Sequence, residues 1–184
     1  MRTILFTILC SFILLIPSTI HAQTIKQEKG FTPKIGVVVC MLDDLKERVT
    51  NSVQDLNVAG TDFLLDENAN RIGAMIYHLA ATEKYYQLYT FEGRDFNADE
   101  RMWDLAQRLG NNARENLKDK PISYYLDIWD EVRKETKRLL KTKDDKWFDQ
   151  KVNGGRMNNH WAWYHVMEHQ ANHMGQINMI VKRI

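Results

Sequence analysis

The sequence predicts an all-α protein: a four-helix bundle with a long crossover, containing a short extra helix, between helices two and three. Along four long segments, apolar residues recur at alternating steps of three and four, which is the spacing of a helix face packed in a bundle. Polar breaks with glycine or proline separate these segments. No segment shows the convincing apolar–polar alternation of a half-buried strand.

Residues 1–22 have the layout of a secretory signal peptide. A positive start at Arg2 precedes an almost unbroken apolar run, residues 4–16, and small or polar residues end at Ala22. The run is about a dozen residues, short of the ~20 needed for a permanent transmembrane helix. We therefore expect cleavage after Ala22, no membrane attachment afterwards, and an exported protein, periplasmic or secreted, with one domain at residues 23–184.

Charge and cysteine content narrow the class of partner. The chain has Lys+Arg 25 against Asp+Glu 24, with no basic run, so neither a nucleic acid nor an anionic membrane is expected as partner. Cys10 lies within the predicted signal peptide, which leaves Cys40 alone in the mature chain and excludes an internal disulfide. The apolar neighbours of Cys40 predict that its thiol is buried and inert.

The first two long helices are predicted at residues 33–56 and 69–91. Pro33 suits a first-turn position, and Gly60 lies in the polar break between the two helices. His78 lies one residue from the seam of the second helix, in a run without charge, and alone would be interpreted as structural. The predicted seams comprise Ile35, Val38, Leu42, Leu45, Val49, Ser52 and Leu56 in the first helix, and Ile72, Met75, Leu79, Thr82, Tyr86 and Tyr89 in the second.

A polar region, residues 92–120, forms the predicted crossover. Asn97 is a suitable cap for a short helix that Gly110 would close. The third long helix is predicted at residues 121–141, and a loop at 142–158 contains Gly154 and Gly155. Because loops at the mouth of a bundle often cover a site, we expect this loop to do so.

The last predicted helix, residues 159–184, carries His165, His169 and His173 four residues apart. Four residues turn a helix about 40° past a full turn, so the three rings form one stripe, at positions where a bundle helix usually has leucine. A lone histidine there is more often a buried residue with its own hydrogen-bond partner. Three in register are harder to satisfy in that way, because each buried ring has two nitrogens to pair. A shared metal ion would meet several of these demands at once.

The spacing HQANH is that of the zinc-protease HExxH helix, but Gln170 stands at the general-base position. An amide takes no proton at neutral pH, so a protease is not expected. Glu168 and Glu83 are the nearby carboxylates in the sequence, and helical geometry places neither well as a catalytic base.

A histidine in the second helix, followed by a last helix reading HVMEHQANHMGQI after WAWYH, resembles the DinB family of metal-binding four-helix bundles. The resemblance spans essentially all of the mature chain. It implies that His78, His169 and His173 hold one divalent metal ion, with an open fourth position. His165, one turn earlier, is either a further ligand or a support for the ligands, and Gln176 could be another support. It also implies that two copies could pair as a homodimer.

Two functions are compatible with this site. The first is a metal-dependent enzyme, of transferase or hydrolase type, acting on an unknown small molecule; some DinB-like proteins resemble thiol-dependent transferases. The alternative is a non-catalytic, exported metal-binding or stress-related protein. Export counts against the thiol version, since small thiols are mainly cytosolic. Imidazole ligands suit zinc, nickel or iron, so they do not identify the metal.

Overall fold

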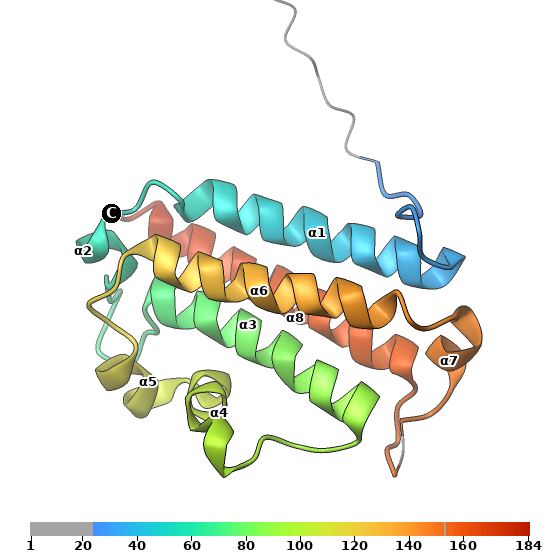
Figure 1. Cartoon of the computed structure of the whole chain (residues 1–184). Coiled ribbons are helices and arrows are strands. Elements are labelled where there is room, and N and C mark those ends of the chain that lie inside the picture. Colours follow the sequence, from blue (N-terminus) through green and yellow to red (C-terminus); the bar gives the residue numbers. More distant parts are fainter. Residues whose placement is uncertain (1–23, 153) are drawn as a thin grey trace, which may run out of the picture.

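Four long helices form a bundle in the computed structural model, which describes residues 24–152 and 154–184 (Figure 1). Helices α1 (Pro33–Val53), α3 (Ile72–Gln87), α6 (Ile122–Leu140) and α8 (Asn159–Val181) are the four. α3 packs between α6 and α8, while α1 packs against α8 and α6. The predicted all-α four-helix bundle is confirmed. The predicted signal peptide lies outside the described residues.

A long crossover joins α3 to α6 and carries the chain back along the bundle, so that these two helices run in the same direction (Figure 1). It contains a short 3₁₀ helix, Ala98–Glu100, then α4 (Arg101–Arg108) and α5 (Gly110–Asn116). Asn97 caps its start as predicted, in a capping box with Glu100. Gly110 follows the end of α4 with φ 73°, but the chain then enters α5, a helix that the sequence did not predict.

The remaining elements are short. α2 (Val58–Thr61) lies between α1 and α3, and α7 (Asp145–Asp149) lies in the loop before α8. The predicted second helix ends its regular α form at Gln87 and continues as one π-helical turn, Leu88–Glu92. Within the described residues there is no strand, only one isolated bridge between Lys151 and Asn158. In the same part of the chain, no helix combines the length and apolar character that crossing a bilayer requires.

α3 is the central helix of the protein, because α4 covers the face that α6 and α8 leave free. Met75, Ile76 and Leu79 are almost completely buried, and Tyr77 packs edge-on against Trp103 of α4, with ring centroids 5.3 Å apart. A helix buried on all sides needs an apolar sequence all round, which explains the long uncharged run around His78.

Two expectations about burial are wrong. The core seam of α8 runs through Trp163, Val166, Gln170 and Ile177, which are buried, whereas the stripe of histidines lies one residue to the side and is only half-buried. The histidines therefore flank the core seam and do not replace its leucines. Cys40 is partly exposed on α1, although its apolar neighbours predicted full burial.

Candidate metal centre

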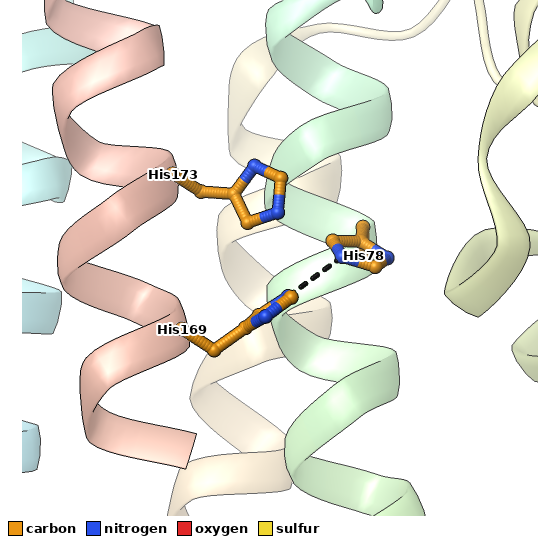
Figure 2. Close-up of side chains that lie close together, drawn as sticks. All are labelled: His78, His169 and His173. Atoms are coloured by element: carbon orange, nitrogen blue, oxygen red, sulfur yellow. Dashed lines mark hydrogen bonds between the residues drawn. The ribbon is translucent and has the colours of Figure 1, made fainter. Parts of the chain in front are cut away.

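Three histidine side chains meet between α3 and α8 (Figure 2). His169 and His173 are one turn apart on α8, and His78 faces them from α3. The ring centroid of His78 lies 4.8 Å from that of each partner, and those of His169 and His173 are 4.6 Å apart. One ring nitrogen from each can be chosen so that all three lie within 4.8 Å of one another. We call these residues the histidine cluster.

The crossover orients His78. Its Nδ1 lies 3.1 Å from the carbonyl oxygen of Ala106 on α4, and a carbonyl can only accept, so Nδ1 carries the proton and donates. In a neutral imidazole this leaves Nε2 with a free lone pair. That Nε2 points at the Nε2 of His169, 2.7 Å away (Figure 2). A backbone carbonyl behind a histidine is the usual way to fix the tautomer of a metal ligand.

Burial keeps the cluster uncharged. Burial, together with the charge of His173, lowers the pKa of His78 to about 4. Burial and the neighbouring histidines lower the pKa of His169 to about 3, and burial also lowers the pKa of His173. Neutral imidazoles are the form that binds a metal ion, so the cluster is ready to bind near neutral pH.

The cluster fits one divalent ion. The Nδ1 of His173 is buried without a hydrogen-bond partner among the described residues, and the other ring nitrogen of His173 faces His78 (Figure 2). Zinc–nitrogen bonds of about 2.0–2.1 Å in a tetrahedral site place ligand nitrogens roughly 3.3 Å apart. The separations here, 2.7 Å between two nitrogens and up to 4.8 Å within the set, lie on both sides of that value. Small ring movements are therefore enough to bind an ion.

The other sequence candidates lie outside this cluster. His165 stacks on Trp161, with ring centroids 5.1 Å apart and planes 9° apart, and its Nδ1 is 3.1 Å from Glu168. Its ring centroid is 5.9 Å from that of His169. Gln176 is exposed and donates to Asn172 Oδ1 at 3.2 Å. A supporting role for either residue stays a prediction.

The loop predicted to cover the site does not lie over it. This loop packs at the start of α8 (Figure 1), and Asn159 is ten residues before His169, roughly 15 Å along the helix axis. The crossover is the element that contacts the cluster, through Ala106. Nothing in the sequence of α4 identifies this contact, because it is made by a main-chain carbonyl.

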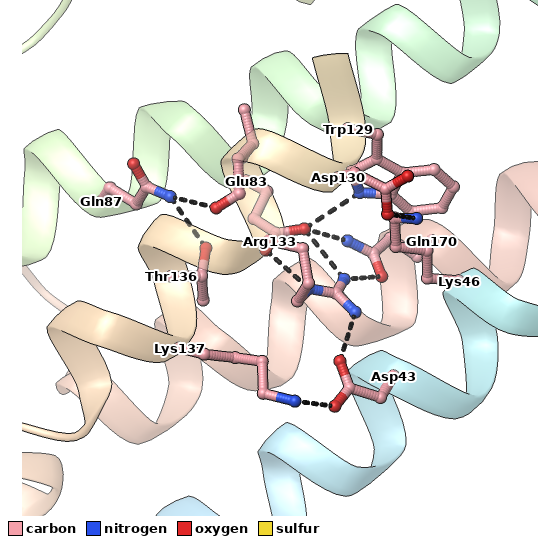
Figure 3. A network of polar contacts seen from close by, with 11 residues as sticks. Asp43, Lys46, Glu83, Gln87, Trp129, Asp130, Arg133, Thr136, Lys137 and Gln170 are labelled. Atoms are coloured by element: carbon pink, nitrogen blue, oxygen red, sulfur yellow. Dashed lines mark hydrogen bonds and ion pairs between the residues drawn. The ribbon is translucent and has the colours of Figure 1, made fainter. Parts of the chain in front are cut away.

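A second buried polar cluster lies beside the first and was missed by sequence reasoning (Figure 3). Arg133 of α6 forms two hydrogen bonds, at 2.8 and 2.9 Å, with the carboxylate of Glu83, which is fully buried. Gln170 and Trp129 also donate to Glu83, at 3.0 and 3.1 Å, and Asp43 of α1 accepts from Arg133 at 3.2 Å. We call these five residues the arginine network.

The arginine network explains two features of the sequence. Glu83 is the first charged residue along the central helix, and it is bound on all sides instead of being free as a catalytic base. Gln170 follows His169 directly, yet its amide faces Glu83 and Arg133. The network joins α1, α3, α6 and α8 and holds the two helices that carry the histidines.

Comparison with known proteins gives a family match. A family model described as mycothiol-S-transferase matches residues 37–184, which includes all four long helices except the first residues of α1. That family is part of the DinB/YfiT-like metal-binding superfamily, so the resemblance found in the sequence is confirmed. The search of curated proteins gave no match.

Proposed function

The chain belongs to the mycothiol-S-transferase family, and from this we propose that it is a metal-dependent transferase acting on a small molecule through the histidine cluster. The observation that carries the proposal is the convergence of three neutral ring nitrogens from two helices, within 4.8 Å of one another. The family match supports the transferase type over the hydrolase type that the sequence also allowed.

The chain's own residues would have distinct tasks. His78, His169 and His173 would hold the ion. Ala106 would keep the Nε2 lone pair of His78 directed at it. A divalent ion in such a site supplies charge that lowers the pKa of a bound thiol. The half-buried position of His169 and His173 leaves one side on which a substrate could approach.

The family name supports a low-molecular-weight thiol as one substrate, and we propose that class here. The second substrate would be a small electrophile that accepts the sulfur. The sulfur–carbon bond would form as the thiol loses its proton to solvent or to a base, and the bond from that carbon to its leaving group, chloride in monochlorobimane, would break with the electron pair leaving on the chloride. Zinc, nickel and iron all accept imidazole nitrogen, so the metal has to be measured.

Purified protein loaded with one metal at a time tests the proposal. Each form would be mixed with a fluorogenic electrophile, monochlorobimane, and with one thiol from a panel of mycothiol, glutathione, coenzyme A and cysteine. We expect conjugation above the uncatalysed rate for at least one metal and thiol, and none with chelator-treated protein. His169→Ala should abolish turnover, while His160→Ala should keep it. A protein that holds metal but gives no turnover with any thiol would favour the non-catalytic alternative.

We also propose export, on the apolar run and the end at Ala22. Mass measurement of the protein from its native source should show a mature chain that begins at Gln23 or within a few residues of it. An intact Met1 start in the cytosolic fraction would contradict export. That result would also remove the objection to a cytosolic thiol as substrate.

A further inference from the structure

An open cavity of about 540 Å³ lies at the end of the bundle where α7 and the loop after it meet the start of α8. It is lined by Asp149, Lys151, Arg156, Met157, Asn158 and Trp161. Trp161 is eight residues before His169 on α8, roughly 12 Å along the helix axis, and no lining residue belongs to the histidine cluster. The cavity is therefore a separate site, large enough for a small organic molecule.

A tight loop brings two cations to this cavity. The main chain of Lys151 forms an antiparallel bridge with that of Asn158, and the N–H of Val152 donates to the carbonyl of Met157 at 3.1 Å. Side chains directly opposite each other in an antiparallel pair point to the same face. Lys151 and Asn158 therefore face the cavity together, and Arg156 lines it from the same loop.

The two glycines that the sequence places in this loop shape its turn. Gly154 has φ 70°, a backbone conformation that favours glycine. A Cβ on Gly155 would lie 2.6 Å from the hydroxyl oxygen of Tyr89, on the π-helical turn after α3, so any side chain there requires Tyr89 to move. The glycine pair therefore has its role at this cavity, and not over the histidine cluster.

The charge at the cavity is positive. Asp149 is the only acidic residue in its lining, and it forms an ion pair with Lys34 of α1 at 2.6 Å. Lys151 and Arg156 form no ion pair with any residue among 24–152 and 154–184. The surrounding segment, residues 141–158, carries five basic and three acidic residues, so the excess is not cancelled nearby. The cavity should therefore attract anions.

A hydrogen-bond donor and a flat apolar wall complete the site. Asn158 Oδ1 accepts from the main-chain N–H of Trp161 at 2.8 Å, which orients the amide and leaves its Nδ2 to donate. The side chain of Trp161 is 46% exposed. His165 stacks on one side of the indole, with ring centroids 5.1 Å apart. The indole is therefore held in place, and its exposed surface can pack against a flat ligand.

From the two uncompensated cations, the amide donor and the exposed indole together, we propose that this cavity binds a small organic acid with a flat apolar body. The carboxylate accepts from the guanidinium of Arg156 and from Asn158 Nδ2, and the charge of Lys151 stabilises it further. The apolar body packs on Trp161. The inference does not depend on the proposed transferase reaction.

Calorimetric titration of the purified, metal-loaded full chain tests the proposal with three probes. 3-Phenylpropionate carries the charge and the apolar body, 3-phenylpropionamide is its neutral analogue, and inorganic phosphate is an anion without an apolar body. We expect 3-phenylpropionate to bind at least about fivefold more tightly than its amide, since it meets two exposed cations, with affinity falling as salt is added. Phosphate should bind more weakly than 3-phenylpropionate. Equal affinity for the acid and its amide, or phosphate binding as tight as that of the acid, would overturn the proposal.

Charge variants locate the binding on this cavity. Arg156→Gln should weaken 3-phenylpropionate binding about two- to fivefold, the range for one exposed charge pair. The double change Lys151→Gln with Arg156→Gln should remove the preference for the acid over its amide. Arg101→Gln, on the exposed side of α4, is the matched control and should leave the affinity unchanged. If the acid bound the ion of the histidine cluster instead, the double variant would keep the preference, and the proposal would fail.

The indole is tested separately. Trp161→Ala should weaken the binding of both 3-phenylpropionate and its amide several-fold, and Trp161→Phe should recover most of the loss, because a phenyl ring restores the flat wall. All the substituted side chains are exposed, so circular dichroism of each variant should stay helical. Unchanged affinity in Trp161→Ala would show that the apolar body binds elsewhere and would refute the assignment to this cavity.

Discussion

The histidine cluster and the arginine network are both polar groups inside the bundle, and both include residues of α3 and α8. They differ in how far the protein itself satisfies their hydrogen bonds. Every charged atom of the network has a partner within the chain: Glu83 accepts from Arg133, Gln170 and Trp129. In the histidine cluster, two ring nitrogens face each other at 2.7 Å and His173 Nδ1 has no partner among the described residues.

This difference indicates a structural role for the arginine network and a ligand-binding role for the histidine cluster. A buried polar network whose members satisfy one another can rigidify a core and needs no ligand. A cluster of neutral rings whose nitrogens converge, one of them with a buried nitrogen that has no partner, gains free energy when a cation binds. We therefore expect changes in the arginine network to affect folding, and changes in the histidine cluster to affect metal binding.

The largest expected effect is on stability, from Arg133→Met. This change leaves the buried carboxylate of Glu83 without its partner, and breaking one side of a buried pair typically costs about 3–5 kcal/mol. Urea unfolding of the metal-free protein should show a loss of this size in the free energy of unfolding. Metal bound per folded chain should not change.

Arg138→Met is the matched control, because Arg138 forms its ion pair with Glu135 on the surface of the same helix. An exposed pair contributes about 0–1 kcal/mol. Similar losses for the two variants would mean that the arginine network is not a structural unit. The double change Glu83→Leu with Arg133→Met should recover part of the loss, since it leaves no uncompensated buried charge.

The next effect is on metal retention, from His169→Ala. Removal of a supporting residue around a metal site typically costs 10–100-fold in affinity, so removal of a ligand should cost roughly 100-fold or more. Elemental analysis after dialysis would measure it, and His78→Ala and His173→Ala should behave alike. In the metal-free state the same variants should unfold at urea concentrations close to that of the unmodified protein.

His160→Ala is the control for the histidine substitutions. His160 is near the start of α8 and stacks on Phe148 of α7, with ring centroids 4.6 Å apart, and it is not among the residues that converge. It should retain metal fully. Loss of the metal in His160→Ala with retention in His169→Ala would refute the assignment.

The bundle could be predicted from the sequence because apolar residues recur with the helical period along four long segments. Each of these helices has to bury one face. The three converging histidines could be named because the spacing on α8 is local and the resemblance supplied His78. The arginine network could not be predicted. Its members come from four helices, and no local pattern tells which face Glu83 or Arg133 takes.

The sequence also could not predict that the histidine stripe lies beside the core seam of α8 and not within it. A face of the last helix one residue to either side has a similar apolar content, and only the packing of α3 against α8 decides which side enters the core. The contact between Ala106 and His78 is made by a main-chain carbonyl, which every residue has. Such a contact leaves no signal in the sequence.

Acidification should affect the histidine cluster before the arginine network. The pKa of His78 is about 4 and that of His169 about 3 in the folded protein, against about 6.5 in an unfolded chain. Below pH 6.5 the unfolded chain therefore binds protons that the folded chain does not, and the free energy of unfolding falls as the pH drops from 6.5 to about 4. Urea unfolding of metal-free protein across this range would measure the fall.

The matched variant for this titration is His78→Ala with His169→Ala, which should lose less stability between pH 6.5 and 4 than the unmodified protein. The metal-loaded protein should release its ion over the lower part of the same range, because protons compete with the metal for the ring nitrogens. Parallel pH profiles for the double variant and the unmodified protein would show that other groups cause the fall.

The smallest effect should come from His165→Ala, and it decides whether the stripe on α8 contributes two ligands or three. The His165 ring is held by Trp161 and Glu168, and it lies one turn before His169, outside the set of converging nitrogens. Removal of a residue that only supports the ligands should cost about tenfold in metal affinity, the lower end of the 10–100-fold range for such residues, measured by competition with a chelator. A loss as large as that of His169→Ala would require the His165 ring to leave Trp161 and join the ion, and the open side of the site would then be closed by a fourth histidine.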